Sequence, residues 1–255
     1  MTSVPALAIN NLHVQFGGIK AIDGLSCTIG DRTITGLIGP NGSGKTTLLN
    51  TITGMTGADA GSIVFDGHAI QGLKPHAIAR HGIGRTFQIT RLFPQMSVLD
   101  NLLIAQKGQK GERIWFGVLG LPSVRAQERQ ARDKALGFLD FTGLTRLQEA
   151  PAGTLSYGQQ KLLEIARIMM LDPSLILLDE PFAGVNPTNV ERLIAFIIEL
   201  NRDRGITIVL VEHMMKIMMR VAQAIIVLKA GQVIATGTPA EVQVNPAAIE
   251  AYLGA

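Results

Sequence analysis

Residues 33–47 read TITGLIGPNGSGKTT, an apolar run that leads directly into a glycine-rich loop. The loop matches the pattern Gly-x-x-x-x-Gly-Lys-Thr, and Leu48, Leu49 and Ile52 follow it at helical spacing. In a strand, glycine loop and helix of this order, backbone N–H groups point at phosphate oxygens and the helix adds its positive end. The stretch therefore predicts a nucleoside-triphosphate site, and its strand and helix argue against an incidental glycine-rich turn.

Consecutive residues of this loop are expected to contact the triphosphate: Gly39, Pro40, Asn41, Gly42, Ser43, Gly44, Lys45, Thr46 and Thr47. Lys45 can place a positive charge on the β- and γ-phosphates. The hydroxyl of Thr46 can be a ligand of Mg²⁺. We therefore expect ATP and Mg²⁺ to bind together at this loop.

Two acidic residues follow a second apolar run, because residues 175–180 read LILLDE. A buried strand here would deliver Asp179 and Glu180 to the carboxyl edge of a sheet, where ligands of such sheets bind. We expect Asp179 to hold Mg²⁺ through water, and Glu180 to orient or deprotonate the attacking water. The alternative is a solvated strand end, but the upstream phosphate loop favours the functional interpretation.

The wider pattern is that of an α/β protein. Residues 175–178 and 206–211 read as buried strands with an amphipathic helix at about 187–201 between them, which is typical of a parallel sheet. Other strands are expected at residues 7–16, 24–29, 61–66, 224–228 and 232–235, and a last helix is expected to start at Thr238. Residues from about 88 to 165 are mainly helical in pattern and are expected to form an inserted subdomain.

Composition excludes several classes of protein. The chain has 255 residues, of which 47% are hydrophobic and 17% charged, so it can bury a large core. Its net charge is only +3 and no basic block occurs, so nucleic acid is not an expected partner. The single cysteine, Cys27, excludes an internal disulfide and fits a reducing compartment. No signal peptide and no membrane-spanning apolar stretch are expected.

Residues 155–160 read LSYGQQ and precede a helical run at 161–171. Ser156 and the amides after it lie at a helix start, which suits a second cradle for a γ-phosphate. With these motifs the chain resembles the ATP-binding cassette (ABC) family, whose signature loop has this form with Gly in place of Tyr157. The resemblance implies a P-loop NTPase fold of the ABC ATPase type, with a parallel core sheet, an antiparallel β subdomain and the helical insertion.

The resemblance also implies an organisation and an assembly. Residues 1–255 would form one ABC domain, with a RecA-like core at 1–87 and 166–255 and a helical subdomain at about 88–165. Two such subunits would form a head-to-tail dimer with two ATP sites. In each site the signature residues of one subunit would close over the nucleotide held by the other subunit: Ser156, Gly158 and Gln159.

Further residues match family landmarks in order along the chain. Gln88 resembles the glutamine that contacts Mg²⁺ and the attacking water, and His213 resembles the histidine that contacts the γ-phosphate. Phe16 matches the aromatic residue that stacks on adenine, although core packing is its alternative role. Two positions depart from the family: Asn186 stands where most members have Asp, and Met214 where a small or acidic residue is usual.

Segments 85–88, 101–106, 156–160 and 251–254 resemble the ATPase subunits of branched-chain amino acid importers. This resemblance implies an ATP-hydrolysing subunit at the cytoplasmic face of the cell membrane. Its partners would be transmembrane permease subunits, a second ATPase subunit and, indirectly, a periplasmic or extracellular substrate-binding protein. The alternatives are a urea or amide importer, lipopolysaccharide export, and a soluble cassette ATPase that acts on ribosomes or DNA. Residues 108–123 include an apolar stretch that fits either a core helix or a patch against a membrane subunit.

Overall fold

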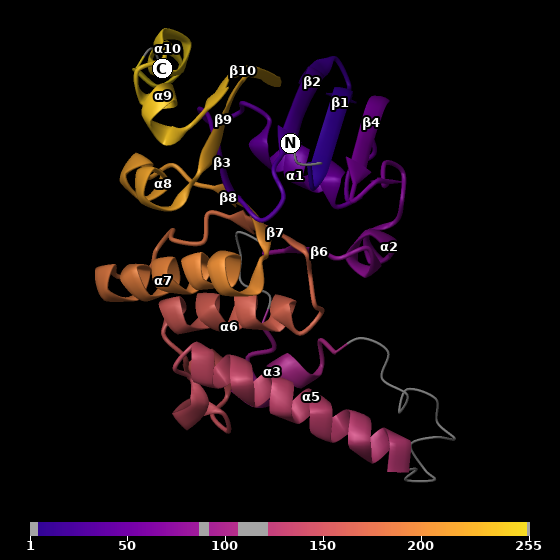
Figure 1. The fold of residues 1–255 in the computed structure, drawn as a ribbon, viewed down its shortest axis with the longest axis vertical. Coiled ribbons are helices and arrows are strands. Elements are labelled where there is room, and N and C mark those ends of the chain that lie inside the picture. The colour runs from indigo at the N-terminus through magenta and orange to yellow at the C-terminus, as the bar shows by residue number, and fades with distance from the viewer. Residues whose placement is uncertain (1–4, 87–91, 107–121, 254–255) are drawn as a thin grey trace. The chain divides into compact units, whose positions relative to one another are not determined.

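The computed structural model describes residues 5–86, 92–106 and 122–253 (Figure 1). The chain divides into two compact units, each with its own interior. Unit 1 contains residues 1–88, 173–181 and 197–255, and unit 2 contains residues 89–172 and 182–196. Most of the helical region expected at 88–165 therefore falls in unit 2, which also includes residues 166–172 and 182–196, both outside this expected region.

A mixed six-stranded sheet forms the centre of unit 1, and its strand order is β10-β9-β3-β8-β7-β6. All neighbours pair in parallel except β10, which is antiparallel to β9. Every residue of β3, β7 and β8 is buried, which explains their continuous apolar sequences. The strands span β3 Ile34–Ile38, β6 Ile83–Arg85, β7 Leu175–Asp179, β8 Thr207–Val211, β9 Ala224–Lys229 and β10 Gln232–Gly237.

An antiparallel four-stranded sheet completes unit 1, in the order β2-β1-β4-β5. Its strands are β1 Leu7–Phe16, β2 Ile19–Ile29, β4 Ala60–Phe65 and β5 His68–Ala69. The second strand was predicted from the sequence to start at residue 24, and this is wrong by five residues. β2 starts at Ile19, which pairs with Phe16 across a tight turn. In the segment from 19 to 23 only Ile22 is buried, and the adjacent apolar residues Ala21 and Ile22 break the strict alternation that predicts a strand.

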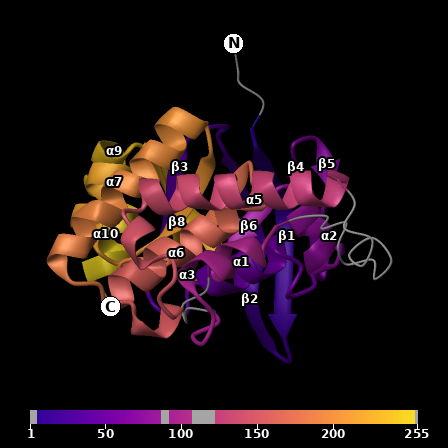
Figure 2. The ribbon, with the colours of Figure 1, turned by 90° about the horizontal axis from the view of Figure 1, so that it is seen from below.

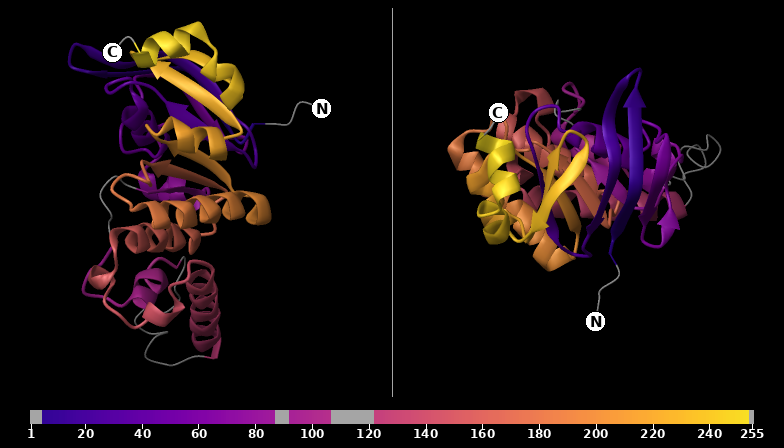
Figure 3. Two further views of the ribbon diagram at one scale, coloured as in Figure 1. Left: turned by 90° about the vertical axis from the view of Figure 1, so that its left-hand side faces the viewer. Right: turned by 90° about the horizontal axis from the view of Figure 1, so that it is seen from above.

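One buried apolar cluster joins both sheets to the helix α1 (Lys45–Ile52). Leu48, Leu49 and Ile52 of this helix contact the cluster, to which the strands of both sheets also contribute. Figure 3 shows the long strands β1 and β2 and the β9–β10 hairpin. The N–H of Asp23 in β2 donates to Gly231 O in the turn of this hairpin at 3.1 Å, which joins the two sheets. The phosphate loop therefore leads into a helix whose position is fixed by the core.

Short helices of unit 1 escaped the sequence analysis: α2 Pro75–Arg80, α8 Met215–Val221 and α10 Pro246–Leu253. Each has eight residues or fewer, which is too short for a helical period to stand out. The helix predicted to start at Thr238 is confirmed as α9 (Pro239–Gln243), which begins with a capping box. It is not the last helix, because α10 follows it.

Unit 2 is helical, and Figure 2 shows its long helix α5 (Pro122–Phe141) alongside α3 (Val98–Leu103) and α6 (Tyr157–Met169). α3 contacts both of the other helices. The first ten residues of α7 (Pro187–Arg204) also belong to this unit, and its Phe196 ring lies 4.9 Å from the ring of Phe141. In the parts of the chain that the structure describes, no helix is long and apolar enough to span a membrane.

Candidate nucleotide-binding site

The phosphate loop runs from the end of β3 to the start of α1, and its glycines adopt conformations closed to other residues. Gly39, Gly42 and Gly44 have φ angles of 155°, 78° and 103°. A Cβ atom on Gly39 would collide with the carbonyl of Leu228, and one on Gly44 would lie 2.6 Å from the oxygen of Ala21. The loop is thus pressed against its neighbours at two glycines, which is the reason that its sequence pattern requires them.

Lys45 is the first residue of α1, and it is 7% exposed. Its ammonium donates to the carbonyl oxygens of Gly39 at 2.8 Å and of Pro40 at 3.0 Å. Burial lowers the pKa of Lys45, and the charges of Glu180 and Asp179 act in the opposite direction. The ammonium of Lys45 is therefore held inside the phosphate loop, which is where it must lie to bind a phosphate.

Sheet topology brings the predicted acidic residues and the histidine together. β7 and β8 are parallel neighbours with Asp179 opposite Val211, so the residues that follow both strands emerge at the same edge. Glu180 adopts a φ of 48°, and its N–H donates to Val211 O at 3.0 Å. Glu180 Oε1 and His213 Nε2 lie 2.8 Å apart, which makes a carboxylate–imidazole pair.

A pocket of about 350 Å³ contains most of the predicted phosphate and catalytic residues. Its lining includes the loop from Asn41 to Thr47, together with Glu180 and His213. Phe16 is not part of this lining, and its side chain is 53% exposed, so the alternative of core packing is wrong for this residue. Its role in adenine stacking stays a prediction. Gln88 and residues 108–121 lie outside the described residues.

Asp179 is buried at the end of β7, where Arg85 holds its side chain. Arg85 Nη2 donates to Asp179 Oδ2 at 3.1 Å, and the backbone N–H of Asp179 donates to Thr86 Oγ1, also at 3.1 Å. No role of Arg85 or Thr86 was predicted from the sequence. One signal could have drawn attention to Arg85. It is a charged residue in a short, otherwise apolar segment, three positions before Gln88.

The signature segment lies in unit 2 at the start of α6, which begins at Tyr157 rather than at residue 161. Ser156 Oγ accepts from Gln159 N at 3.4 Å, and Gln159 Oε1 accepts from Ser156 N at 2.9 Å. This reciprocal capping box fixes the helix start. A Cβ atom on Gly158 would lie 2.6 Å from the Cβ of Asn189, so this position has no room for a side chain.

The departure at Asn186 has a structural explanation. Its Oδ1 accepts a hydrogen bond from Asn189 N at 2.9 Å, which caps the first turn of α7. Asn and Asp are equally good at this position of a helix, so the cap survives the loss of charge. Met214 is 50% exposed after His213, and nothing in the structure explains its presence there.

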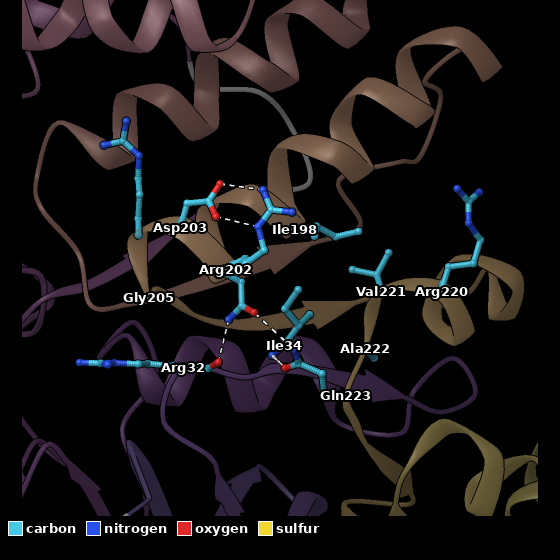
Figure 4. A pocket seen from close by; sticks show the side chains of 12 residues that line it. Arg32, Ile34, Ile198, Arg202, Asp203, Gly205, Arg220, Val221, Ala222 and Gln223 are labelled. Atoms are coloured by element: carbon cyan, nitrogen blue, oxygen red, sulfur yellow. Dashed lines mark hydrogen bonds and ion pairs between the residues drawn. The ribbon is translucent and has the colours of Figure 1, made fainter.

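A second pocket, of about 760 Å³, lies at the amino edge of the six-stranded sheet, opposite to the phosphate loop (Figure 4). Arg202 is paired with Asp203 at 2.6 and 2.9 Å, while Arg32 and Arg220 point in different directions. Because these cations do not converge on one point, the pocket does not form a built anion site.

A parallel sheet that presents a phosphate loop, two carboxylates and a histidine at one edge defines a P-loop nucleotide hydrolase. The chain belongs to the ABC transporter family, which matches residues 22–183. The family described as "Branched-chain amino acid ATP-binding cassette transporter" also matches, at residues 232–255.

Known proteins of this family resemble the chain over its whole length. The branched-chain amino acid transport ATP-binding protein BraF of Pseudomonas aeruginosa is 42% identical over 252 residues, which cover 99% of each chain. A crystal structure of an ABC transporter cassette in its ADP conformation has a TM-score of 0.85 and 35% identity, and it covers 99% of this chain and 100% of that one. A dimeric cassette bound to ADP and Pi has a TM-score of 0.74 and 26% identity, with 91% and 98% covered.

Proposed function

We propose that the chain hydrolyses ATP to power the import of branched-chain amino acids through a transmembrane permease. The substrate class rests on the match of residues 232–255 to the branched-chain amino acid cassettes, together with the full-length similarity to BraF. The nucleotide site itself carries no information on the transported molecule, because the motifs that form it serve only ATP.

In this proposal the phosphate loop binds the triphosphate of ATP. The loop is preformed by its glycines, and the N-terminus of α1 points its N–H groups and its positive end toward bound phosphate. The ammonium of Lys45 exchanges its carbonyl partners, Gly39 and Pro40, for phosphate oxygens. Phe16 offers an exposed aromatic face on which adenine can stack.

Glu180 is the proposed general base for the attacking water. A carboxylate in this role must be oriented, and the 2.8 Å contact with His213 Nε2 supplies that orientation when this nitrogen carries the proton. A neutral imidazole has a single N–H, so His213 would turn this donor from Glu180 toward the γ-phosphate as charge develops there. Gln88 is proposed to orient the same water and to contact the metal ion.

The donor set fits Mg²⁺, which prefers oxygen ligands and keeps several of its waters beside substrate phosphates. Thr46 offers a hydroxyl in the first turn of α1, and Asp179 offers a carboxylate at the end of β7. Bound Mg²⁺ would neutralise charge on the β- and γ-phosphates. Thr46 and, through a bound water, Asp179 are therefore the proposed ligands, with Gln88.

ABC transporter ATPase subunits work with membrane permeases and dimerise, as the dimeric cassette among the structural relatives illustrates. We infer that Ser156, Gly158 and Gln159 of one subunit close over the ATP bound by a second subunit. The start of α6 at this segment supports this role, because the first N–H groups of a helix have no acceptor within the helix and suit a phosphate.

The permease is inferred to contact unit 2 beside the segment of Gln88. Phe93 follows that segment, and its ring is 47% exposed with the guanidinium of Arg167 5.8 Å from its centre. We further infer that the subunit lies peripherally at the cytoplasmic face of the membrane, with a substrate-binding protein on the other side.

Uptake measurements test the proposal directly. Cells lacking this chain should lose ATP-dependent uptake of radiolabelled leucine, isoleucine and valine. The wild-type chain should restore uptake, and Lys45→Ala should not, although it accumulates to the same level. Unchanged uptake of all three amino acids, with loss of urea uptake or of lipopolysaccharide export instead, would contradict the proposed cargo while leaving the ATPase role intact.

A further inference from the structure

One buried arginine connects the two segments that carry the proposed metal ligands. Arg85 ends β6, and only 6% of its side chain is exposed, beside an Asp179 side chain that is 8% exposed. Its Nη2 donates to Asp179 Oδ2 at 3.1 Å. Its Nη1 donates to Asn50 Oδ1 at 2.7 Å and lies 3.3 Å from Thr53 Oγ1.

We propose that Arg85 is a positioning residue for the metal site, which holds the carboxylate of Asp179 in the orientation needed for Mg²⁺ and couples it to α1. This inference rests on the proposed role of Asp179 as a magnesium ligand. Its guanidinium donates to Asp179 and to residues at the end of α1, so it would act through Asp179 and α1.

Arg85 balances the charge of the buried Asp179 carboxylate. A buried carboxylate without a partner is strongly unfavourable, and a guanidinium offsets part of that cost while fixing one carboxylate oxygen by a charge-assisted hydrogen bond. The backbone of Asp179 is fixed as well, because its N–H donates to Thr86 Oγ1 and Leu177 O accepts from Thr86 N at 3.0 Å. Arg85 and Thr86 therefore set both the backbone and the side chain of Asp179.

Arg85 also contacts the C-terminal end of α1. Asn50 lies in the last turn of this helix and Thr53 is its C-cap, whereas Thr46 lies in its first turn. A guanidinium can hold a carboxylate and two helix-end oxygens at once, because its donors diverge in a fixed plane. Arg85 thereby ties the segment that carries Asp179 to the helix that carries Thr46, at a sheet edge next to the segment of Gln88.

The test is a Mg²⁺ titration of nucleotide binding by the purified full-length chain, followed with a fluorescent ATP analogue. We expect Arg85→Gln to bind the analogue like the wild type in EDTA, because the phosphate loop is untouched. The Mg²⁺ concentration that gives half of the metal-dependent tightening should rise by ~10-fold or more, as is usual when a partner of a metal ligand is lost. Arg85→Lys should show a smaller rise, because an ammonium keeps the charge but not the planar fork.

Two further variants separate positioning from stability. Asn201→Ala removes a buried side chain of the same unit that donates to Arg32 O and to Ile206 O, both at 2.9 Å, at the far edge of the sheet. It should lower the melting temperature and leave the Mg²⁺ requirement unchanged. Asn50→Ala keeps the Arg85–Asp179 pair but removes its anchor on α1, so it should raise the Mg²⁺ requirement even if Arg85→Gln does not fold.

An unchanged or lower Mg²⁺ requirement in folded Arg85→Gln, or an unchanged one in Asn50→Ala, would overturn the inference. The variant Asp179→Asn serves as a reference that separates failure of this inference from failure of the proposed role of Asp179. If the wild type and Asp179→Asn respond identically to Mg²⁺, the assignment of Asp179 fails. If they differ and the Arg85 variants follow the wild type, only the role of Arg85 fails.

Discussion

Glu180 shows how a single backbone angle places the side chain of the proposed general base. It follows β7 with a φ of 48°, in the left-handed region where a residue other than glycine costs roughly 1–3 kcal/mol. This turn and the hydrogen bond to Val211 O bring the carboxylate within 2.8 Å of His213. Local strain of this kind clusters at functional sites, which agrees with the proposed base.

Replacement of Glu180 by Gln tests that role at the residue itself. The amide keeps the shape but cannot accept a proton from water, so turnover should fall by ~10²–10⁴-fold. ATP binding should persist, because the phosphate loop is unaffected, and the variant should accumulate as an ATP-bound dimer. Turnover and gel filtration with ATP measure both effects. Turnover close to that of the wild type would exclude Glu180 as the base.

Cys27 is a second residue whose chemistry follows from its surroundings. It lies in β2 against the core, and burial raises the pKa of its thiol to about 12. The thiolate is the reactive form, so labelling of the native chain by Ellman's reagent near neutral pH should be ~10²-fold or more slower than labelling in denaturant. Equal rates in the folded and unfolded chain would show that Cys27 is accessible.

At the scale of elements, long apolar patterns predicted the structure well and short ones did not. The phosphate loop, β7, β8 and the start of α9 could be read from the sequence, because each combines a clear period with a defined start or end signal. β6 and α8 have three and seven residues, too few for a period. The contact of Arg85 with Asp179 joins residues 94 positions apart, which no local pattern can reveal.

The capping box of α9 provides a prediction with a defined pH dependence. Hydrogen bonds from the backbone N–H and the hydroxyl of Thr238 hold the pKa of Glu241 below its usual 4.5. A lowered pKa in the folded state stabilises the chain above the unfolded pKa, and this contribution is lost as the pH falls through the folded pKa. The wild type should therefore melt above Glu241→Ala at neutral pH, and the two melting temperatures should converge in acid.

A matched variant checks that the pH dependence arises from this cap. In a Thr238→Ala background the hydroxyl is absent and the cap is weakened, so replacement of Glu241 by Ala should have a smaller effect at every pH. If the difference between the wild type and Glu241→Ala grows in acid, the sign of the pKa shift is wrong.

At the scale of the whole molecule, the residues of the proposed site divide between the two units. The phosphate loop, Asp179, Glu180 and His213 belong to unit 1, whereas Ser156, Gly158 and Gln159 belong to unit 2. The sequence predicted both groups and the helical insertion, because each group has its own motif. Residues 182–196, which follow β7, belong to the helical unit, and this was not predicted from the sequence. Their membership depends on packing between helices that are distant in the sequence.

The central claim is that each ATP site combines the phosphate loop of one subunit with the signature of another. Lys45→Ala should disable the loop of its own subunit and leave its signature intact. Ser156→Arg should do the reverse, because a bulky cation replaces the small cap at the start of α6. Each variant alone should be inactive, since every site of its homodimer contains one defect.

A mixed dimer of the two variants, isolated by a different tag on each, is the most direct measurement. One of its sites carries both defects and the other carries none, so the intact site should close over one ATP. The account predicts that ATP-dependent association returns on mixing, together with a part of the wild-type turnover. If mixed dimers form but show neither ATP-dependent closure nor any turnover, the shared site is contradicted for this protein.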